Sequence, residues 1–432
     1  MSEKLKNKIM NKIFSSRLVV LFILVNVFSS SVWSQQNIPD NIAYGIATKG
    51  GSGGRIIKVT NLNADGPGSL KSAIQEDGPR IVVFEVGGVI DLKKGRIDVS
   101  KPFITIAGQT APSPGITIIQ GGMDVKAHDV IIQHIRIRPG DAGEPKKSGW
   151  EPDGLSTVGA NAFHVIIDHC SMTWAVDENL SASASGPRTG PDATSHKITF
   201  SNNIIAEGLF DASHLKGIHS MGSLIHDFVQ DVAIVGNLYS CNNQRNAFFK
   251  AFTKAAFVNN VIYNPGNFAI QMFWSQKELE NLPFKPENGQ VSVVGNVMYK
   301  GANSKKNMAM ISRQGDVYLE DNEAYEADGT ATPLTSGEIN ILKEKPSWPT
   351  NLTALPSKDV PDYIIQHAGA RPRDRDEIDK RIIQDFISRK GHLINSQDEV
   401  GGYPKYAPTY RKLDIPAQNI DKWLLKLAAE LE

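Results

Sequence analysis

Cysteine is scarce in this 432-residue chain, which holds only Cys170 and Cys241. A small secreted fold held together by disulfides needs more bridges than two cysteines can form, so that class is excluded. A chain of this length can bury a core without them. The repeat described below places the two cysteines about two coils apart, and we therefore expect two free, mostly buried thiols.

An excess of either charge is also missing, because 46 Lys and Arg residues balance 46 Asp and Glu residues. Proteins that bind nucleic acid carry a strong basic excess, so the composition argues against a nucleic-acid partner. Hydrophobic residues make up 41% of the chain, and the only long apolar run lies near the start. These values exclude a disordered chain, a coiled coil and a membrane bundle.

Residues 1–34 have the layout of a secretory signal peptide. A basic start that ends at Arg17 is followed by an apolar run from Leu18 to Phe28 and by a polar stretch up to Ser34. The run is too short to span a bilayer as a helix, which disfavours the alternative of a membrane anchor. Its removal leaves 41 positive against 45 negative charges. We predict a weakly acidic, secreted monomer, periplasmic or extracellular, without membrane contact after cleavage.

One eight-residue pattern recurs seven times. Its first, third and eighth positions are apolar, and its sixth position, called the special position below, is asparagine in five of the seven copies. An example is Ile198-x-Phe200-x-x-Asn203-x-Ile205. The period-2 spacing predicts strands with one face turned inward. Asparagine at a fixed phase predicts a bend with unusual backbone angles, where each amide bonds to the next. The special residues of the seven copies are Ile135, Cys170, Asn203, Asn237, Asn260, Asn296 and Asn322.

The shortest spacing between copies is 23 residues, from Asn237 to Asn260, which matches one coil of a parallel β-helix. Longer spacings add loops, and repeats of this period collect such loops on one face. We therefore predict an all-β fold, a single-stranded parallel β-helix over residues 35–330. An antiparallel sandwich of similar strands is the alternative, although it does not explain asparagine at one phase.

Both ends of the coil need covers, because stacked strands expose their edges. Gly66-Pro67-Gly68-Ser69 followed by Leu70, Ala73 and Ile74 predicts a short N-terminal capping helix. Residues 331–432 are Pro-rich and contain two amphipathic segments, which predicts a tail of loops and helices packed along the coil. The apolar faces of the two segments consist of Ile378, Ile382, Ile383, Phe386 and Ile387, and of Ile420, Trp423, Leu424, Leu427 and Leu431.

Charged residues recur at one phase after the special position. Asp177 and Glu178 follow Cys170 by seven and eight residues, Asp211 follows Asn203 by eight, and Arg245 follows Asn237 by eight. Stacked coils lie roughly 4.8 Å apart, so these residues form a column of about 10 Å from Glu178 to Arg245. Asp153 lies in the preceding loop. Carboxylate oxygens gathered on loops suit Ca²⁺, which takes six to eight oxygen ligands.

With these residues, the sequence resembles the pectate lyases of polysaccharide lyase family 1, especially secreted bacterial forms. The resemblance covers residues 44 to about 404, and its most specific part combines an Ile-Asp-His-Cys block with a Gly-Pro-Gly-Ser-Leu block. The matching segments are Gly54-Arg55, Val59-Thr60-Asn61-Leu62-Asn63, Gly66-Pro67-Gly68-Ser69-Leu70, Ile104-Thr105-Ile106-Ala107-Gly108-Gln109-Thr110-Ala111-Pro112, Ile166-Ile167-Asp168-His169-Cys170-Ser171, Trp174, Asp177-Glu178, Gly369-Ala370-Arg371-Pro372-Arg373-Asp374 and Val400-Gly401-Gly402-Tyr403-Pro404.

The resemblance implies a right-handed β-helix that cleaves an acidic polysaccharide, α-1,4-linked polygalacturonate, by calcium-assisted β-elimination. It implies Asp153 and Asp177 as calcium ligands. The family often has a third carboxylate where this chain has Ser181. Glu178 and Asp211 are the two candidates to complete the calcium site in its place, and Glu178 is the one we assign. It implies Arg245 as the catalytic base, and Lys216 and Lys250 as substrate-binding residues. Phe248 and Lys250 stand where the family has arginines.

Two other functions are compatible with a β-helix that carries acidic loops. A glycoside hydrolase acting on polygalacturonate needs paired carboxylates as acid and base, which Asp177, Glu178 and Asp211 can supply. It needs neither Arg245 nor calcium. A non-catalytic carbohydrate-binding β-helix needs no cluster of ions at all.

Overall fold

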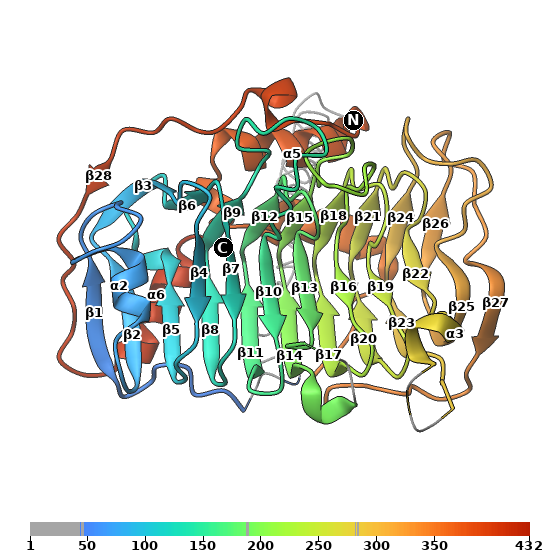
Figure 1. Cartoon of the computed structure of the whole chain (residues 1–432), viewed down its shortest axis with the longest axis horizontal. Helices are drawn as coiled ribbons and strands as arrows, with labels where there is room; N and C mark the ends of the chain where they lie inside the picture. Colours follow the sequence, from blue (N-terminus) through green and yellow to red (C-terminus); the bar gives the residue numbers. More distant parts are fainter. Residues whose placement is uncertain (1–43, 45–46, 187–189, 281, 283–284) are drawn as a thin grey trace, which may run out of the picture. The chain divides into compact units, whose positions relative to one another are not determined.

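The strands of the chain stack into three parallel columns (Figure 1). The computed structural model describes residues 44, 47–186, 190–280, 282 and 285–432, all within one compact unit, Asp40–Glu432. The predicted signal peptide, residues 1–34, lies outside the described residues. No helix among the described residues is long and apolar enough to cross a membrane.

Each coil of the chain passes through the first, the second and then the third column. The first column consists of β1 (Arg55–Val59), β2 (Arg80–Phe84), β5 (Ile104–Ala107), β8 (Val130–Gln133), β11 (Phe163–Asp168), β14 (His196–Ser201), β17 (Gln230–Val235), β20 (Lys254–Val258), β23 (Gln290–Val294) and β25 (Ile311–Glu320). The second column consists of β3 (Val86–Asp91), β6 (Ile116–Ile119), β9 (Ile135–Arg138), β12 (Ser171–Thr173), β15 (Ile204–Ala206), β18 (Leu238–Ser240), β21 (Val261–Tyr263), β24 (Val297–Tyr299) and β26 (Glu323–Tyr325).

The third column consists of β4 (Arg96–Val99), β7 (Gly122–Val125), β10 (Leu155–Val158), β13 (Leu180–Ser183), β16 (Leu224–Ile225), β19 (Phe248–Phe249), β22 (Ile270–Met272), the first part of β25 and β27 (Thr335–Ile341). The strand pairings of the described residues within the columns are parallel, and β28 (Thr409–Tyr410) pairs antiparallel with β3. This arrangement is a right-handed parallel β-helix, so the predicted fold is confirmed. The coil continues through β27 and thus ends later than the predicted boundary at residue 330.

The sequence repeat and the strand register agree coil by coil. Val165 pairs with Val130 on one side and Ile198 on the other, and Ile198 pairs with Val232. These apolar side chains are fully buried in one core that runs through the coils. Cys170 and Cys241 are both free and buried, as predicted.

The repeated asparagines form a buried ladder between the first and second columns. The side-chain amide of Asn203 donates to Asn237 at 2.9 Å, and the series continues through Asn260, Asn296 and Asn322 at 2.9–3.0 Å. The left-handed backbone angle lies at the residue before each asparagine, for example Asn202 with φ 54°. The asparagines therefore supply hydrogen bonds rather than the unusual backbone angle that we expected of them.

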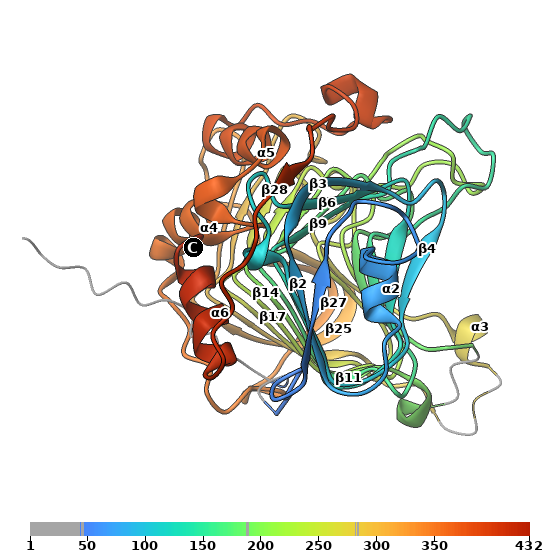
Figure 2. The same cartoon turned by 90° about the vertical axis from the view of Figure 1, so that its left-hand side faces the viewer.

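Helices cover one end and one side of the coil. Helix α2 (Leu70–Ile74) begins at Ser69, whose hydroxyl accepts from the Ser72 amide, and it buries Leu70, Ala73 and Ile74 as predicted. Figure 2 shows α4 (Val360–His367), α5 (Glu377–Ser388) and α6 (Ile420–Ala429) on the same side of the coil. The short α3 (Gln276–Leu279) lies on another loop, and 3₁₀ turns span Gly108–Thr110, Pro191–Ala193, Ser357–Asp359, Pro372–Asp374 and Gln397–Val400.

Helix α5 is fixed to the second column by buried ion pairs. Arg138 contacts Asp376 at 2.6 Å and Asp379 at 2.7 Å, and Arg136 contacts Asp379 at 3.0 Å. The apolar face of α5 is buried as predicted except for Ile387, which is 47% exposed. In α6, by contrast, only Leu424 and Ala428 are buried.

Candidate active site

The loops from the second column to the third carry the predicted site residues except Lys250, which follows β19. Asp153 precedes β10, Glu178 precedes β13 and Arg245 precedes β19, so the parallel stacking brings them to one face. Two isolated bridges extend the register into these loops, from Glu178 to Met221 and from Met221 to Gln244. Arg245 therefore stands two coils from Glu178 on the same face.

Three carboxylates gather at this face. One oxygen each from Asp153, Asp177 and Glu178 lies within 4.8 Å of the others. Asp153 accepts hydrogen bonds from the Glu178 amide at 3.1 Å and from the Ser156 hydroxyl at 3.0 Å. Burial, and next the charge of Asp177, raise the pKa of Asp153 to about 7. Burial and the neighbouring carboxylate thus disfavour the ionised form of Asp153.

This donor set fits a hard divalent cation. All three residues offer oxygen ligands, which Ca²⁺ prefers. The buried Oε1 of Glu178 forms no hydrogen bond with the described residues and is contacted by the Arg245 guanidinium alone, so a cation that binds there takes the place of that guanidinium. The proton that Asp153 retains is one that a bound cation would displace.

Arg245 lies against the carboxylate cluster. Its guanidinium contacts the carboxylate of Glu178 and lies 5.7 Å from the centroid of the Phe248 ring. Its backbone amide donates to the Gln271 side chain at 2.8 Å. Burial lowers the pKa of Arg245, and the nearby charges of Asp177 and Asp153 act in the opposite direction.

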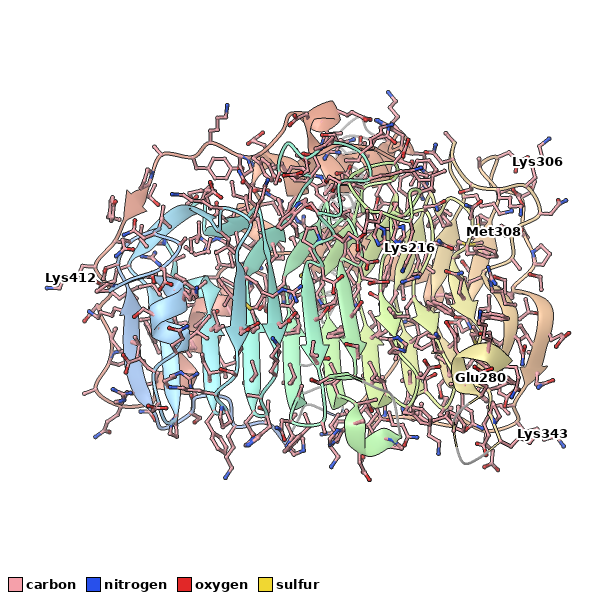
Figure 3. All side chains as sticks on the ribbon, in the orientation of Figure 1. Lys216, Glu280, Lys306, Met308, Lys343 and Lys412 are labelled. Carbon is pink, nitrogen blue, oxygen red and sulfur yellow. The ribbon has the colours of Figure 1, made fainter. Side chains whose placement is uncertain are left out.

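A groove of about 440 Å³ runs over these loops. Lys216, which is exposed, and Lys250, which is buried, both line it together with Arg245. Figure 3 shows Lys216 over the green part of the coil. Lys250 contacts Glu278 at 2.9 Å and Asp227 at 3.5 Å, so neighbouring carboxylates already hold its ammonium group.

Asp211 does not occupy the place that its phase predicts. Its carboxylate pairs with Lys146 at 2.7 Å, and Met221 takes the position between Glu178 and Gln244. The loop between β15 and β16 is long, so counting residues from Asn203 does not give the register after it.

Ser181 takes part in the contact between neighbouring coils. Its side-chain hydroxyl accepts a hydrogen bond from the Leu224 backbone amide at 3.1 Å, next to the carboxylates.

Sequence reasoning missed two histidines and one arginine at this face. His214 and His219 stack with ring centroids 3.4 Å apart, and their Nε2 atoms lie 3.6 Å and 3.5 Å from the Asp177 carboxylate. Arg313 lines the groove from β25. None of the three lies at a fixed distance from the special position of the repeated pattern, which is why counting did not find them. The close spacing of His214, Lys216 and His219 is the feature of the sequence that indicates a polar cluster there.

No family model matches the chain. A protein from Aspergillus flavus named "Probable pectate lyase C" is 32% identical over 379 residues, which cover 84% of this chain and 80% of the relative. The described fold is similar to that of the cedar pollen allergen Jun a 1, with a TM-score of 0.55 and 18% identity over 79% of this chain and 97% of that one.

A structure described as "Pectate lyase bound to hexasaccharide" has a TM-score of 0.51 and 15% identity, covering 79% of this chain and 99% of that one. At such identities the two structures support the fold alone, whereas the Aspergillus relative extends the likeness to sequence over most of both chains. The chain therefore belongs to the pectate lyase family and is a polysaccharide lyase of the parallel β-helix type.

Proposed function

We propose that the chain cleaves α-1,4-linked polygalacturonate by β-elimination, with Arg245 as the base that removes the C5 proton. The observation that carries the proposal is the position of the Arg245 guanidinium beside three clustered carboxylates, in a groove lined by lysines. Family membership supports the same reaction.

The reaction removes a proton from the carbon next to a carboxylate, so negative charge develops there. Asp153, Asp177 and Glu178 are the residues that would hold Ca²⁺. When bound, Ca²⁺ supplies positive charge that stabilises the enolate-like dianion. Loss of the glycosidic oxygen from C4 of this dianion leaves a C4–C5 double bond, and the departing oxygen takes up a proton and becomes the hydroxyl of the new reducing end.

An arginine is an unusual base, because its ordinary pKa lies above 12. Burial lowers the pKa of Arg245, which raises the neutral fraction that can accept the C5 proton. The contact with Glu178 favours the charged form instead. We expect Glu178 to leave Arg245 when it binds a cation, which frees the guanidinium to face the substrate.

Lys216 and Lys250 are the proposed substrate-binding residues. Lys216 is exposed at the groove, so its ammonium group can reach a uronate carboxylate from solvent. Lys250 is held between Glu278 and Asp227, which fixes its position but neutralises part of its charge. We therefore assign the larger share of carboxylate attraction to Lys216.

We also propose that the mature protein is secreted and acts as a monomer. The basic start, the apolar run of limited length and the polar stretch that ends at Ser34 support export. A polymer of sugar acids outside the cytoplasm is compatible with an exported enzyme.

The deciding experiment incubates purified protein with polygalacturonate and Ca²⁺ and follows ultraviolet absorbance and reducing ends together. We expect both to rise, because elimination creates an unsaturated product. Reducing ends without absorbance would indicate the hydrolase, and no cleavage across several uronans would indicate the binding protein. Inactivation by EDTA with recovery on Ca²⁺ addition tests the metal.

A further inference from the structure

Arg313 extends the groove beyond the residues assigned so far. Its strand β25 pairs in register with β22, which pairs with β19 next to Arg245. Arg313 is the direct partner of Met272. Two coil steps correspond to roughly 10 Å along the groove, so Arg313 lies beyond the reach of one sugar unit bound at Arg245.

The charge of Arg313 is not neutralised by the protein. Arg245 contacts Glu178, and Lys250 contacts Glu278 and Asp227. No carboxylate of the described part of the chain forms an ion pair with Arg313, and burial alone lowers its pKa. A free cation at the wall of a groove attracts anions from solvent.

Two aromatic rings hold this guanidinium in place. It lies 4.5 Å from the ring centroid of Phe268 and 5.2 Å from that of Phe273, both distances at which the ring face attracts a cation. Phe273 also lines the groove. A stacked guanidinium keeps its edge free, and that edge matches a carboxylate with two parallel hydrogen bonds.

The backbone at Arg313 is in an unfavourable conformation. Its φ is 85°, a left-handed value that few residues other than glycine adopt. Gly337 packs directly against the Arg313 carbonyl on the next strand. The chain also holds non-glycine residues at left-handed angles at the bends before the ladder asparagines, so the angle at Arg313 shows only that its neighbours fix this backbone.

We propose that Arg313, supported by Phe268 and Phe273, forms a separate subsite that binds the carboxylate of a sugar acid two coils away from Arg245. The inference rests on the proposed function, because it assumes an acidic polysaccharide in the groove. Its consequence is a preference for long, unesterified chains that reach both positions.

The test measures binding without cleavage. Calorimetry with galacturonate hexamer and Ca²⁺ compares the variant Arg245→Ala with the double variant Arg245→Ala/Arg313→Ala. Loss of one charge-assisted pair should weaken binding about tenfold or more. The matched control adds Lys254→Ala instead, which removes an exposed charge at the start of β20, outside the groove lining. Equal affinities in the double variant and its parent would overturn the proposal, as would equal weakening by the control.

Two further variants separate binding from folding. Arg313→Gly removes the backbone strain, so it should keep or raise the melting temperature while binding remains weak. Arg313→Lys keeps the charge but not the paired donors and should recover only part of the affinity. A Gly variant that binds as tightly as its parent would overturn the subsite.

In the otherwise unaltered enzyme, Arg313→Ala should raise KM for polygalacturonate and leave kcat within about twofold, because Arg313 lies away from the bond that breaks. A fall in kcat with unchanged KM would contradict this role. If the unaltered enzyme failed to cleave uronans while Arg313→Ala still weakened hexamer binding, the proposed function would fail and the subsite would stand.

Discussion

At the scale of single residues, the site depends on two groups that burial moves toward their neutral forms. Asp153 retains a proton up to a pKa of about 7, and Arg245 has a lowered pKa although it is surrounded by acids. Both shifts have burial as their largest cause. Burial thus favours the protonated carboxyl form of Asp153, whose proton a bound cation displaces. It also raises the fraction of Arg245 that is neutral.

Replacement of Arg245 by alanine should lower kcat by about 10²–10⁴-fold, the usual contribution of a positioned base. Arg245→Lys should remain strongly impaired, because the shorter lysine side chain does not place a basic nitrogen where the guanidinium lies. Rates on polygalacturonate and melting temperatures are measured together. The control is Arg55→Ala, which breaks an exposed ion pair with Glu76 far from the groove loops and should retain full activity. Near-normal turnover by Arg245→Ala would remove Arg245 from the base role.

The raised pKa of Asp153 predicts a pH dependence of stability in the absence of metal. The folded protein holds a proton that the unfolded chain releases near pH 4, so this contribution to the free energy of unfolding is fully present below about pH 4. It is lost as the pH rises through about 7. Denaturation in EDTA should show this loss, and Asp153→Asn should abolish it.

The same shift predicts that Ca²⁺ binding at pH 6 releases a proton, because the metal needs the ionised carboxylate. Calorimetry in two buffers with different ionisation heats measures the release. Identical binding heats in both buffers would show that Asp153 is already ionised or does not take part.

At the scale of secondary-structure elements, the asparagine ladder joins successive coils at one bend. Asn260 accepts from the backbone and side-chain amides of Asn237 and donates to the carbonyl of Ile234 and to Asn296. All of these groups are buried. The ladder therefore satisfies backbone groups that no strand pairing reaches, and it holds the loops that follow in register.

Asn260→Ala should lower the free energy of unfolding by about 1–3 kcal/mol, because it leaves buried donors without acceptors. Chemical denaturation measures the change. Asn340→Ala removes an exposed asparagine that donates to Asp316 at 2.9 Å, and it should change stability far less. Similar losses in the two variants would mean that the ladder adds nothing beyond an ordinary surface hydrogen bond.

At the scale of the whole molecule, residues far apart in the sequence fix the helical tail to the coil. Arg136 and Arg138 lie on β9, and their partners Asp376 and Asp379 lie at the start of α5. The four side chains are almost completely buried. The acids raise the pKa of Arg138 above its ordinary value, and the arginines lower the pKa of Asp376, so this pair stays charged in spite of its burial.

Asp379→Ala should destabilise the protein by about 3–5 kcal/mol, since it leaves buried arginine charge without its partner. Glu377→Ala, on the exposed face of the same helix, serves as the control. Denaturation curves measure both variants, and proteolysis of the tail reports whether α5 detaches. A stable Asp379→Ala variant would show that α5 is held by its apolar face alone.

The sequence by itself determined the coil. Its period-2 apolar residues set the register, as the pairing of Val165 with Val130 and Ile198 shows, and its cysteines remain free because they lie on different coils. It also brought Asp153, Asp177, Glu178 and Arg245 to one face, since they lie in equivalent loops of stacked coils.

Only the tertiary structure decided what the long loops do. The displacement of Asp211 by Met221 and the stacked His214 and His219 beside Asp177 follow from no repeat. The physical reason is that strand pairing fixes the phase of residues only within the columns. An inserted loop folds according to its contacts with neighbouring coils, which belong to distant parts of the chain.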